Sequence, residues 1–127
     1  MLQRRKELIA KYDAALKPLG VQVLAHYADG YESCGHLYLS FIPSITPEQR
    51  NEIIIKMAQR GIACNVHYKP LPMHTAYKEL GFDIADFPNA YAHFAHEISL
   101  PLHTRLTDAE ADYVAENFVE ILKDYLK

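Results

Sequence analysis

The stretch GIACNVHYKP, residues 61–70, organises the rest of this chain. Apolar side chains occupy every second position and more polar ones lie between them, which is the period of a half-buried β-strand. A glycine opens the run and a proline ends it, so we predict a short strand whose polar end leads into a loop. Ligand-contacting side chains often lie in such loops, which makes His67, Tyr68 and Lys69 candidates for a site. An edge strand with a solvated polar face has the same pattern, and periodicity alone favours that plainer interpretation.

The composition is that of an ordinary globular domain. A chain of 127 residues is long enough to bury a real core, and we expect residues 1–127 to form a single domain. The 13 Lys and Arg are balanced by 16 Asp and Glu, which gives a formal net charge of −3. Basic residues gather only at Arg4 to Lys6, where the helix dipole disfavours cations. No nucleic-acid partner is therefore expected.

Cysteine content and hydropathy indicate the compartment. Cys34 and Cys64 are the only cysteines and lie 30 residues apart, which is typical of free thiols in a reducing cytoplasm. The chain contains no apolar segment long enough to span a bilayer. We expect a cytoplasmic protein without a membrane partner.

Three long helices are predicted from apolar residues at three- and four-residue spacing. The first covers residues 3–17, the second residues 47–60, and the third runs from a start near residue 107 to the C-terminus. A Thr followed three residues later by Gln or Glu, at 46–49 and 107–110, is the capping-box pattern at the start of the second and third helices.

The remaining chain predicts short strands and short helices. Strands are predicted at 21–27, 36–42 and 97–100, the second of them from its alternating apolar and polar side chains, with a loop at 28–35 between the first two. Two short helices are predicted, one ending at Gly81 and one beginning at Pro88. Strands this close together leave no room for repeated crossovers. The pattern is typical of an α+β domain with a small, mainly antiparallel sheet packed against helices.

No complete catalytic or metal-binding set is present in the sequence. His93 and His96 are three residues apart on a predicted helix, but no third or fourth ligand follows at a recognisable spacing. Cys34 lies in a loop and Cys64 on the predicted core face, so neither shows the surroundings of an activated thiolate. We predict no catalytic residue and no metal site.

Several segments resemble, in order and spacing, the C-terminal part of the DegT/StrS family of aminotransferases. They are RRKELIAKYDAAL (4–16), GIACNVHYKPLPMHTAY (61–77), DFPNAYAHFAHEISLPLH (86–103) and LTDAEADYV (106–114). These enzymes use pyridoxal phosphate, and most of them aminate keto sugars carried on nucleotides. The resemblance implies the small domain of fold type I, which closes over the active site. It also implies that the N-terminal domain with the cofactor and its Schiff-base lysine is absent from this chain.

The resemblance implies roles for specific residues. In the family, glutamate usually gives its amino group to the cofactor, which then aminates the sugar. This chain is predicted to be inactive alone and to bind no pyridoxal phosphate by itself. In the whole enzyme it would supply one wall of the nucleotide-sugar site and take part in domain closure. His67 and Tyr68 match the family's HY-x-P block, with His67 a donor or acceptor for a sugar hydroxyl or phosphate. Lys69 adds charge suited to a diphosphate.

Alternatives remain open for each of these residues. Tyr68 has the parity of Cys64 and packs in the core on that interpretation, while Lys69 is then only solvated.

A homo-oligomer is expected because a domain separated from its enzyme exposes apolar surface. The alternative function is an autonomous, non-catalytic α+β module with a binding or regulatory role.

Overall fold

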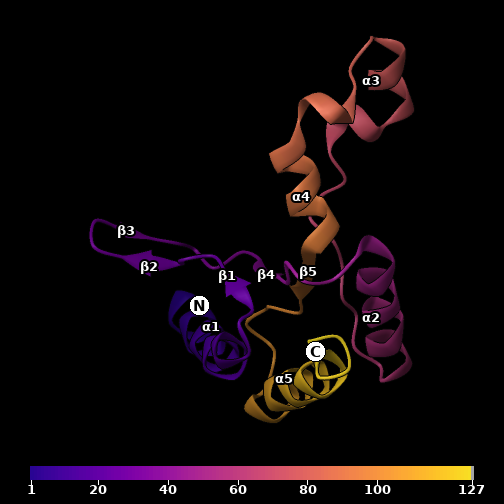
Figure 1. The fold of residues 1–127 in the computed structure, drawn as a ribbon. Helices are drawn as coiled ribbons and strands as arrows, with labels where there is room; N and C mark the ends of the chain where they lie inside the picture. Colours follow the sequence, from indigo (N-terminus) through magenta and orange to yellow (C-terminus); the bar gives the residue numbers. More distant parts are fainter. Residues whose placement is uncertain (127) are drawn as a thin grey trace.

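Three long helices form one layer of the molecule. The structure is a computed structural model that describes residues 1–126. Its long helices are α1 (Leu2–Leu16), α2 (Pro47–Gln59) and α5 (Asp108–Leu122), which confirms the predicted helices to within a few residues at each end. α5 contacts both α1 and α2 and lies between them in Figure 1. Their apolar faces supply most of the core.

The sequence-encoded caps of α2 and α5 are formed. Thr46 Oγ1 accepts a hydrogen bond from the backbone N–H of Gln49 at 3.2 Å, and Gln49 Oε1 accepts one from the Thr46 N–H at 2.8 Å. Thr107 and Glu110 repeat this reciprocal pair with the same two distances. Each box satisfies N–H groups that have no partner within the helix, so both helix starts follow from local sequence.

A small antiparallel sheet lies on the helices. It contains β1 (Gln22–Val23), β4 (Tyr38–Phe41) and β5 (Glu97–Leu100), in the order β1-β4-β5. Both pairs of neighbouring strands are antiparallel. The predicted α+β class, with a small antiparallel sheet packed against helices, is confirmed.

The strand register divides the sheet into two faces. Tyr38 pairs with Leu100 and Ser40 with Ile98, and this face packs on the helices as part of the core. The alternate pairs, Leu39 with Ser99 and Phe41 with Glu97, must point to the opposite side because successive side chains of a strand alternate. We call this side the outer face of the sheet.

The strand predicted at residues 61–70 is wrong apart from one bridge. Asn65 and Ser99 exchange backbone hydrogen bonds of 3.2 and 2.8 Å as an isolated antiparallel bridge beside β5. Toward one end the ladder meets Pro101, which has no N–H to donate. Toward the other, the His67 N–H donates to the side chain of Glu97 instead of to a strand backbone. The pairing therefore ends on both sides of the bridge.

A β-hairpin replaces the loop predicted at residues 28–35. The predicted strand 21–27 ends early, and its last residue starts β2 (Tyr27–Ala28), which pairs with β3 (Tyr31–Glu32). Asp29-Gly30 forms the two-residue turn, and Gly30 has a positive φ of 91°, which glycine adopts without steric cost. The Asp-Gly pair was a readable hairpin signal, but the strands flanking it are only two residues long.

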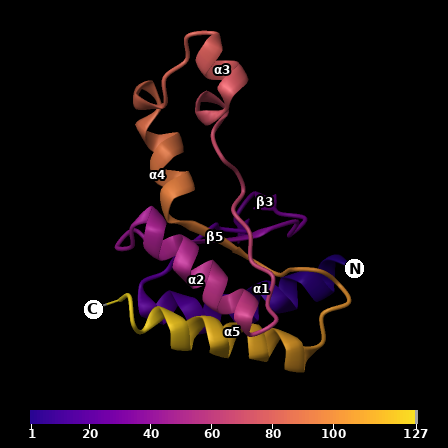
Figure 2. The ribbon, with the colours of Figure 1, turned by 90° about the vertical axis from the view of Figure 1, so that its right-hand side faces the viewer.

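An arm projects from the helices and sheet. It comprises residues 70–96 and contains two 3₁₀ turns, η2 (Leu71–Met73) and η3 (Ile84–Asp86), and two helices, α3 (Thr75–Glu79) and α4 (Pro88–His96). Figures 1 and 2 both show α3 at the end farthest from α1, α2 and α5. Of its four elements only α4 contains a buried residue, Ala95. We call the rest of the described chain the body.

Candidate functional site

His67 lies where the chain leaves the body for the arm, and it is fastened to β5 at two points. Its backbone N–H donates to Glu97 Oε2 at 2.8 Å, and its ring Nδ1 is 2.7 Å from Ser99 Oγ. Glu97 and Ser99 are two residues apart on one strand, so both side chains stand on the outer face of the sheet. His67, which the sequence predicted as a site residue, thus forms a hydrogen-bonded cluster with Glu97 and Ser99, which the sequence did not predict.

Glu97 is the buried anchor of this cluster. Its side chain is wholly inaccessible, with 0 % exposure, although a buried carboxylate is costly unless its oxygens are hydrogen-bonded. Ser99 Oγ–H donates to Oε1, and the His67 N–H donates to Oε2. Both oxygens are therefore satisfied. The only sequence signal for Glu97 was a charged residue at the start of an otherwise apolar strand.

Opposing effects set the pKa of Glu97. Burial is the strongest and raises the pKa above the ordinary value of a glutamate. Hydrogen bonds from Ser99 and His67, together with the charges of His93 and Arg50, act in the opposite direction. The raised pKa therefore reflects desolvation that its partners compensate only in part.

Arg50 links the arm to the body near this cluster. It is a buried residue of α2, and its Nη1 donates to the backbone oxygen of Phe94 in α4 at 2.6 Å. The guanidinium also lies 4.7 Å from the centre of the Phe94 ring, within the range of a cation–π interaction. Burial lowers the pKa of Arg50, while the Glu97 carboxylate raises it. The arginine therefore supplies positive charge on the buried side of the cluster.

Tyr68 and Lys69 are exposed beside His67. The Tyr68 side chain is 68 % exposed, so the alternative that it packs in the core is wrong. Its ring stands nearly perpendicular to the His67 ring, with the two centres 4.6 Å apart, and the peptide bond between the residues is cis. Lys69 is exposed and forms no ion pair with the described residues. The structure thus presents three adjacent polar side chains, and only the first is held in place.

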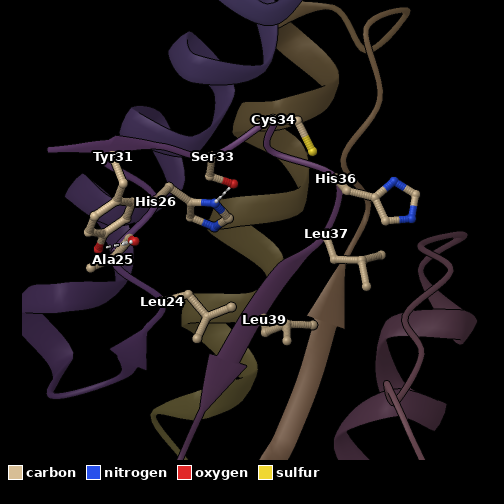
Figure 3. Close-up of a pocket in the computed structure, with 9 residues that line it drawn as sticks. All are labelled: Leu24, Ala25, His26, Tyr31, Ser33, Cys34, His36, Leu37 and Leu39. Atoms are coloured by element: carbon tan, nitrogen blue, oxygen red, sulfur yellow. Dashed lines mark hydrogen bonds between the residues drawn. The ribbon is translucent and has the colours of Figure 1, made fainter. Parts of the chain in front are cut away.

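A separate pocket of about 470 Å³ lies between the hairpin and the sheet, and its lining is mostly apolar. Figure 3 shows the His26 ring hydrogen-bonded to Ser33, with 3.1 Å between Nδ1 and Oγ. His26 is buried, which lowers its pKa, and its Nε2 has no hydrogen-bond partner among residues 1–126. Leu24 and Leu39 close the lower part of the pocket in this view. Sequence analysis did not anticipate this cavity, because it depends on the unpredicted hairpin.

The remaining cysteine and histidine candidates do not assemble into a site in the structure. Burial raises the pKa of Cys64 to about 12, so this thiol is not activated, whereas Cys34 is exposed. His93 packs edge-on against the Phe41 ring, with centres 4.5 Å apart. Within residues 1–126 no three His, Cys, Asp or Glu side chains are grouped closely enough to hold a metal ion.

The arrangement of helices, sheet and arm can be compared with known proteins. Residues 1–119 match the DegT/DnrJ/EryC1/StrS aminotransferase family. The chain belongs to this family. A putative sugar aminotransferase, Spr1654 of Streptococcus pneumoniae, is 48% identical, and its solved structure in the pyridoxamine phosphate form superimposes with a TM-score of 0.95. The predicted family and fold are therefore both confirmed.

Curated relatives are also similar over nearly the whole chain. The spore coat polysaccharide biosynthesis protein SpsC of Bacillus subtilis is 30% identical over 97% of this chain and 32% of its own length. The UDP-4-amino-4,6-dideoxy-N-acetyl-beta-L-altrosamine transaminase of Helicobacter pylori is 26% identical over 98% of this chain and 33% of its own length. The Streptococcus pneumoniae structure is covered to 32%, against 99% of this chain. The chain therefore spans about a third of the length of the relatives it matches.

Members of the family use pyridoxal phosphate, and the Streptococcus pneumoniae protein has been solved in pyridoxal and pyridoxamine phosphate forms. A Schiff-base lysine is commonly activated by desolvation. None of the lysines among residues 1–126 is buried. Lys6, Lys11 and Lys17 pair with acids, Lys56 lies over Tyr125, and Lys69, Lys78 and Lys123 are exposed. These lysines do not fit the cofactor by themselves.

In the part of the chain that is described, no helix is long and apolar enough to cross a membrane.

Proposed function

We propose that this chain is the small domain of a sugar-nucleotide aminotransferase and forms one wall of its substrate site. The observation that carries the proposal is the position of His67. A buried carboxylate and a serine hold its backbone and ring, while Tyr68 and Lys69 extend from the same point into solvent. An imidazole held by hydrogen bonds, beside an exposed cation and an aromatic ring, suits a ligand that has hydroxyls and a diphosphate.

The reaction proposed for the whole enzyme is transfer of an amino group, with glutamate as the donor, to a keto sugar carried on a nucleotide. Pyridoxal phosphate supplies the electron sink for this transfer in the family. Residues of this chain bind and orient the sugar nucleotide: His67 hydrogen-bonds the sugar, Tyr68 packs against it, and Lys69 faces the diphosphate. We further propose that residues 1–127 form one domain that moves toward the bound substrate as the site closes.

We propose that the protein works as a homo-oligomer in the cytoplasm, without nucleic-acid or membrane partners. Large apolar side chains of the arm are exposed, among them Leu80 at 74 % and Phe82 at 47 %. Such surface is commonly covered by another protein surface. Cys34 and Cys64 are both free thiols, as is usual for proteins of a reducing compartment.

A chimeric enzyme tests the substrate role. The matching third of the Streptococcus pneumoniae sugar aminotransferase is replaced by residues 1–127, because the two chains are 48% identical and superimpose closely. Conversion of the pyridoxal to the pyridoxamine form is followed by absorbance after adding either glutamate or UDP-4-amino-4,6-dideoxy-N-acetyl-β-L-altrosamine, the sugar of the Helicobacter pylori relative. We expect both amines to react.

The substitution His67→Ala separates substrate binding from catalysis by the cofactor. Loss of one hydrogen bond should raise the half-saturating concentration of the amino sugar about tenfold, while the reaction with glutamate stays unchanged. His103→Ala serves as the control, because His103 is an exposed histidine that makes no side-chain hydrogen bond among residues 1–126. Equal behaviour of both variants would contradict the role of His67. A chimera that binds the sugar nucleotide but never reacts would favour the non-catalytic module.

A further inference from the structure

Glu97, Ser99 and His67 are linked by consecutive hydrogen bonds, and the donor of each bond can be assigned. Ser99 has one hydroxyl proton, and the geometry gives that proton to Glu97 Oε1. A serine oxygen that has donated its proton still has lone pairs and can only accept further hydrogen bonds. The His67 Nδ1, 2.7 Å from this oxygen, must then be the nitrogen that carries a proton.

We propose that Glu97, acting through Ser99, keeps the proton of neutral His67 on Nδ1, so that Nε2 meets the substrate as a hydrogen-bond acceptor. An acceptor selects a hydroxyl or an N–H and disfavours a phosphate oxygen, which has no proton to give at neutral pH. The inference rests on the proposed substrate contact of His67 and sharpens it. The imidazole would bind a sugar hydroxyl, and Lys69 would be the residue that faces the diphosphate.

The Nε2 atom of His67 is free to make this contact. No hydrogen bond joins it to any residue of 1–126, and it is not among the buried nitrogens that lack a partner, so it is open to solvent. The neighbouring Tyr68 ring is exposed and stands perpendicular to the imidazole. Nε2 is therefore accessible from solvent.

The charges around Glu97 favour the ionised carboxylate that this direction requires. Arg50 faces it from α2, His93 from α4, and Ser99 and His67 donate to it from β5 and from the segment before the arm. The aromatic ring of Phe41 is its register partner on β4 and carries no charge. The four polar neighbours oppose the effect of burial on the pKa of Glu97. The carboxylate is thus supported from α2, α4, β5 and the segment before the arm.

Replacing Glu97 by glutamine reverses the chain of hydrogen bonds. The His67 backbone N–H can only donate, so it requires the oxygen of the new amide at the position of Oε2. The amide NH₂ must then face Ser99 and donate to its Oγ. Ser99 in turn gives its proton to Nδ1 of His67, which transfers the histidine proton to Nε2. Exchange of one carboxylate oxygen for an amide NH₂ in a buried side chain should therefore invert the tautomer of His67 through the bridging Ser99.

Nitrogen NMR of the chain labelled with ¹⁵N-histidine measures the tautomer directly. In samples kept at about pH 8.5, to favour neutral imidazole, we expect Nδ1 of His67 to resonate as a protonated nitrogen and Nε2 as an unprotonated one. The Glu97→Gln variant should show the opposite assignment. Ser99→Ala removes the bridge and should give a mixture of both tautomers. Glu116→Gln, a change of equal chemistry at an exposed residue of α5, should leave the wild-type assignment unchanged.

Two outcomes would overturn the inference, and neither involves the substrate. The first is an Nε2–H tautomer in the wild type. The second is an unchanged tautomer in folded Glu97→Gln and Ser99→Ala variants, with folding checked by amide spectra. Adding UDP-4-amino-4,6-dideoxy-N-acetyl-β-L-altrosamine to the chimeric enzyme then tests the contact itself. If the wild-type tautomer is found and His67→Ala leaves binding of the sugar unchanged, the proposed substrate role fails while the hydrogen-bond relay stands.

Discussion

The body and the arm of this molecule differ in how far they bury their apolar side chains. In the body, α1, α2 and α5 bury their apolar residues against one another and the sheet, and large side chains such as Phe118 and Tyr12 are wholly enclosed. In the arm, Leu80, Phe82 and Phe87 remain exposed, and three of the four helical elements bury nothing. The body has the contacts of an independently stable fold. The arm leaves large apolar side chains in contact with solvent.

The candidate site lies at the junction of these two regions. His67 precedes the arm, while Glu97 and Ser99 directly follow it, so the cluster fastens the two ends of the arm together. Arg50 makes a second connection from α2 to Phe94 in α4. A buried polar cluster at this position fixes where the arm leaves the body, because both oxygens of Glu97 and Nδ1 of His67 have specific partners. The comparison between body and arm therefore leads to four tests.

The largest difference is expected for the loss of a phenylalanine ring. Phe118→Ala in α5 should lower the free energy of unfolding by about 3–5 kcal/mol, since it leaves a cavity in a closed core. Phe82→Ala in the arm should cost less than about 1 kcal/mol, because that ring is 47 % exposed. Urea unfolding measures both. Equal costs would mean that the arm is as tightly packed as the body, and the comparison would fail.

Self-association should depend on the arm and not on the body. An apolar pocket of about 420 Å³ lies among Pro70, Tyr77, Phe82 and neighbouring residues, close to exposed Leu80. The double change Leu80→Lys and Phe82→Lys should weaken self-association at least about tenfold, because each lysine would need desolvation at an interface. Sedimentation over a range of concentrations measures the effect. Leu2→Lys, at an apolar residue of α1 that is also exposed, is the control. A wild-type chain that stays monomeric throughout would refute the expectation.

The helix caps provide a smaller difference. Thr107→Ala removes a formed capping box at the start of α5 and should cost about 1 kcal/mol. Thr75→Ala, at the start of α3, removes no side-chain cap and should change stability by only a few tenths of a kcal/mol. Thermal and urea unfolding of both variants provide the measurement. A large effect at Thr75 would reveal a contribution of the arm that its exposed contacts do not explain.

The smallest expected effect is the pH dependence contributed by Glu97 at the junction. Because its folded-state pKa is raised, the folded protein binds this proton more tightly than the unfolded chain does. Its contribution is complete below the ordinary pKa of about 4.3 and is lost as the pH rises through the folded-state value. Glu97→Gln should therefore gain stability relative to the wild type over this range, by less than about 1.4 kcal/mol per pH unit. His26, whose pKa is lowered by burial, has the opposite dependence and cancels in this difference. If the free energies of unfolding of the wild type and Glu97→Gln changed with pH in the same way, Glu97 would not be desolvated.

Local sequence was enough to predict the helices. Apolar spacing together with the Thr46 and Thr107 capping boxes located α2 and the start of α5 to within one residue, because caps and periodicity are properties of adjacent residues. The predicted end of α5 at the C-terminus was too late, since the helix ends at Leu122. His67 was also found from the sequence, by its place at the polar end of residues 61–70 and by the resemblance of that block to the family. The strands were predicted less well, since strand length depends on which neighbour supplies the hydrogen bonds.

What the sequence by itself determined is the three long helices and the family, since both depend on short-range patterns of side chains. Only the tertiary structure decided the partners of His67. The whole arm lies between His67 and its partners Glu97 and Ser99 in the sequence, so the fold of the arm brings them together. The β4–β5 register places both partner side chains on the outer face of the sheet. A contact between residues 30 positions apart depends on packing and register, which no local pattern specifies.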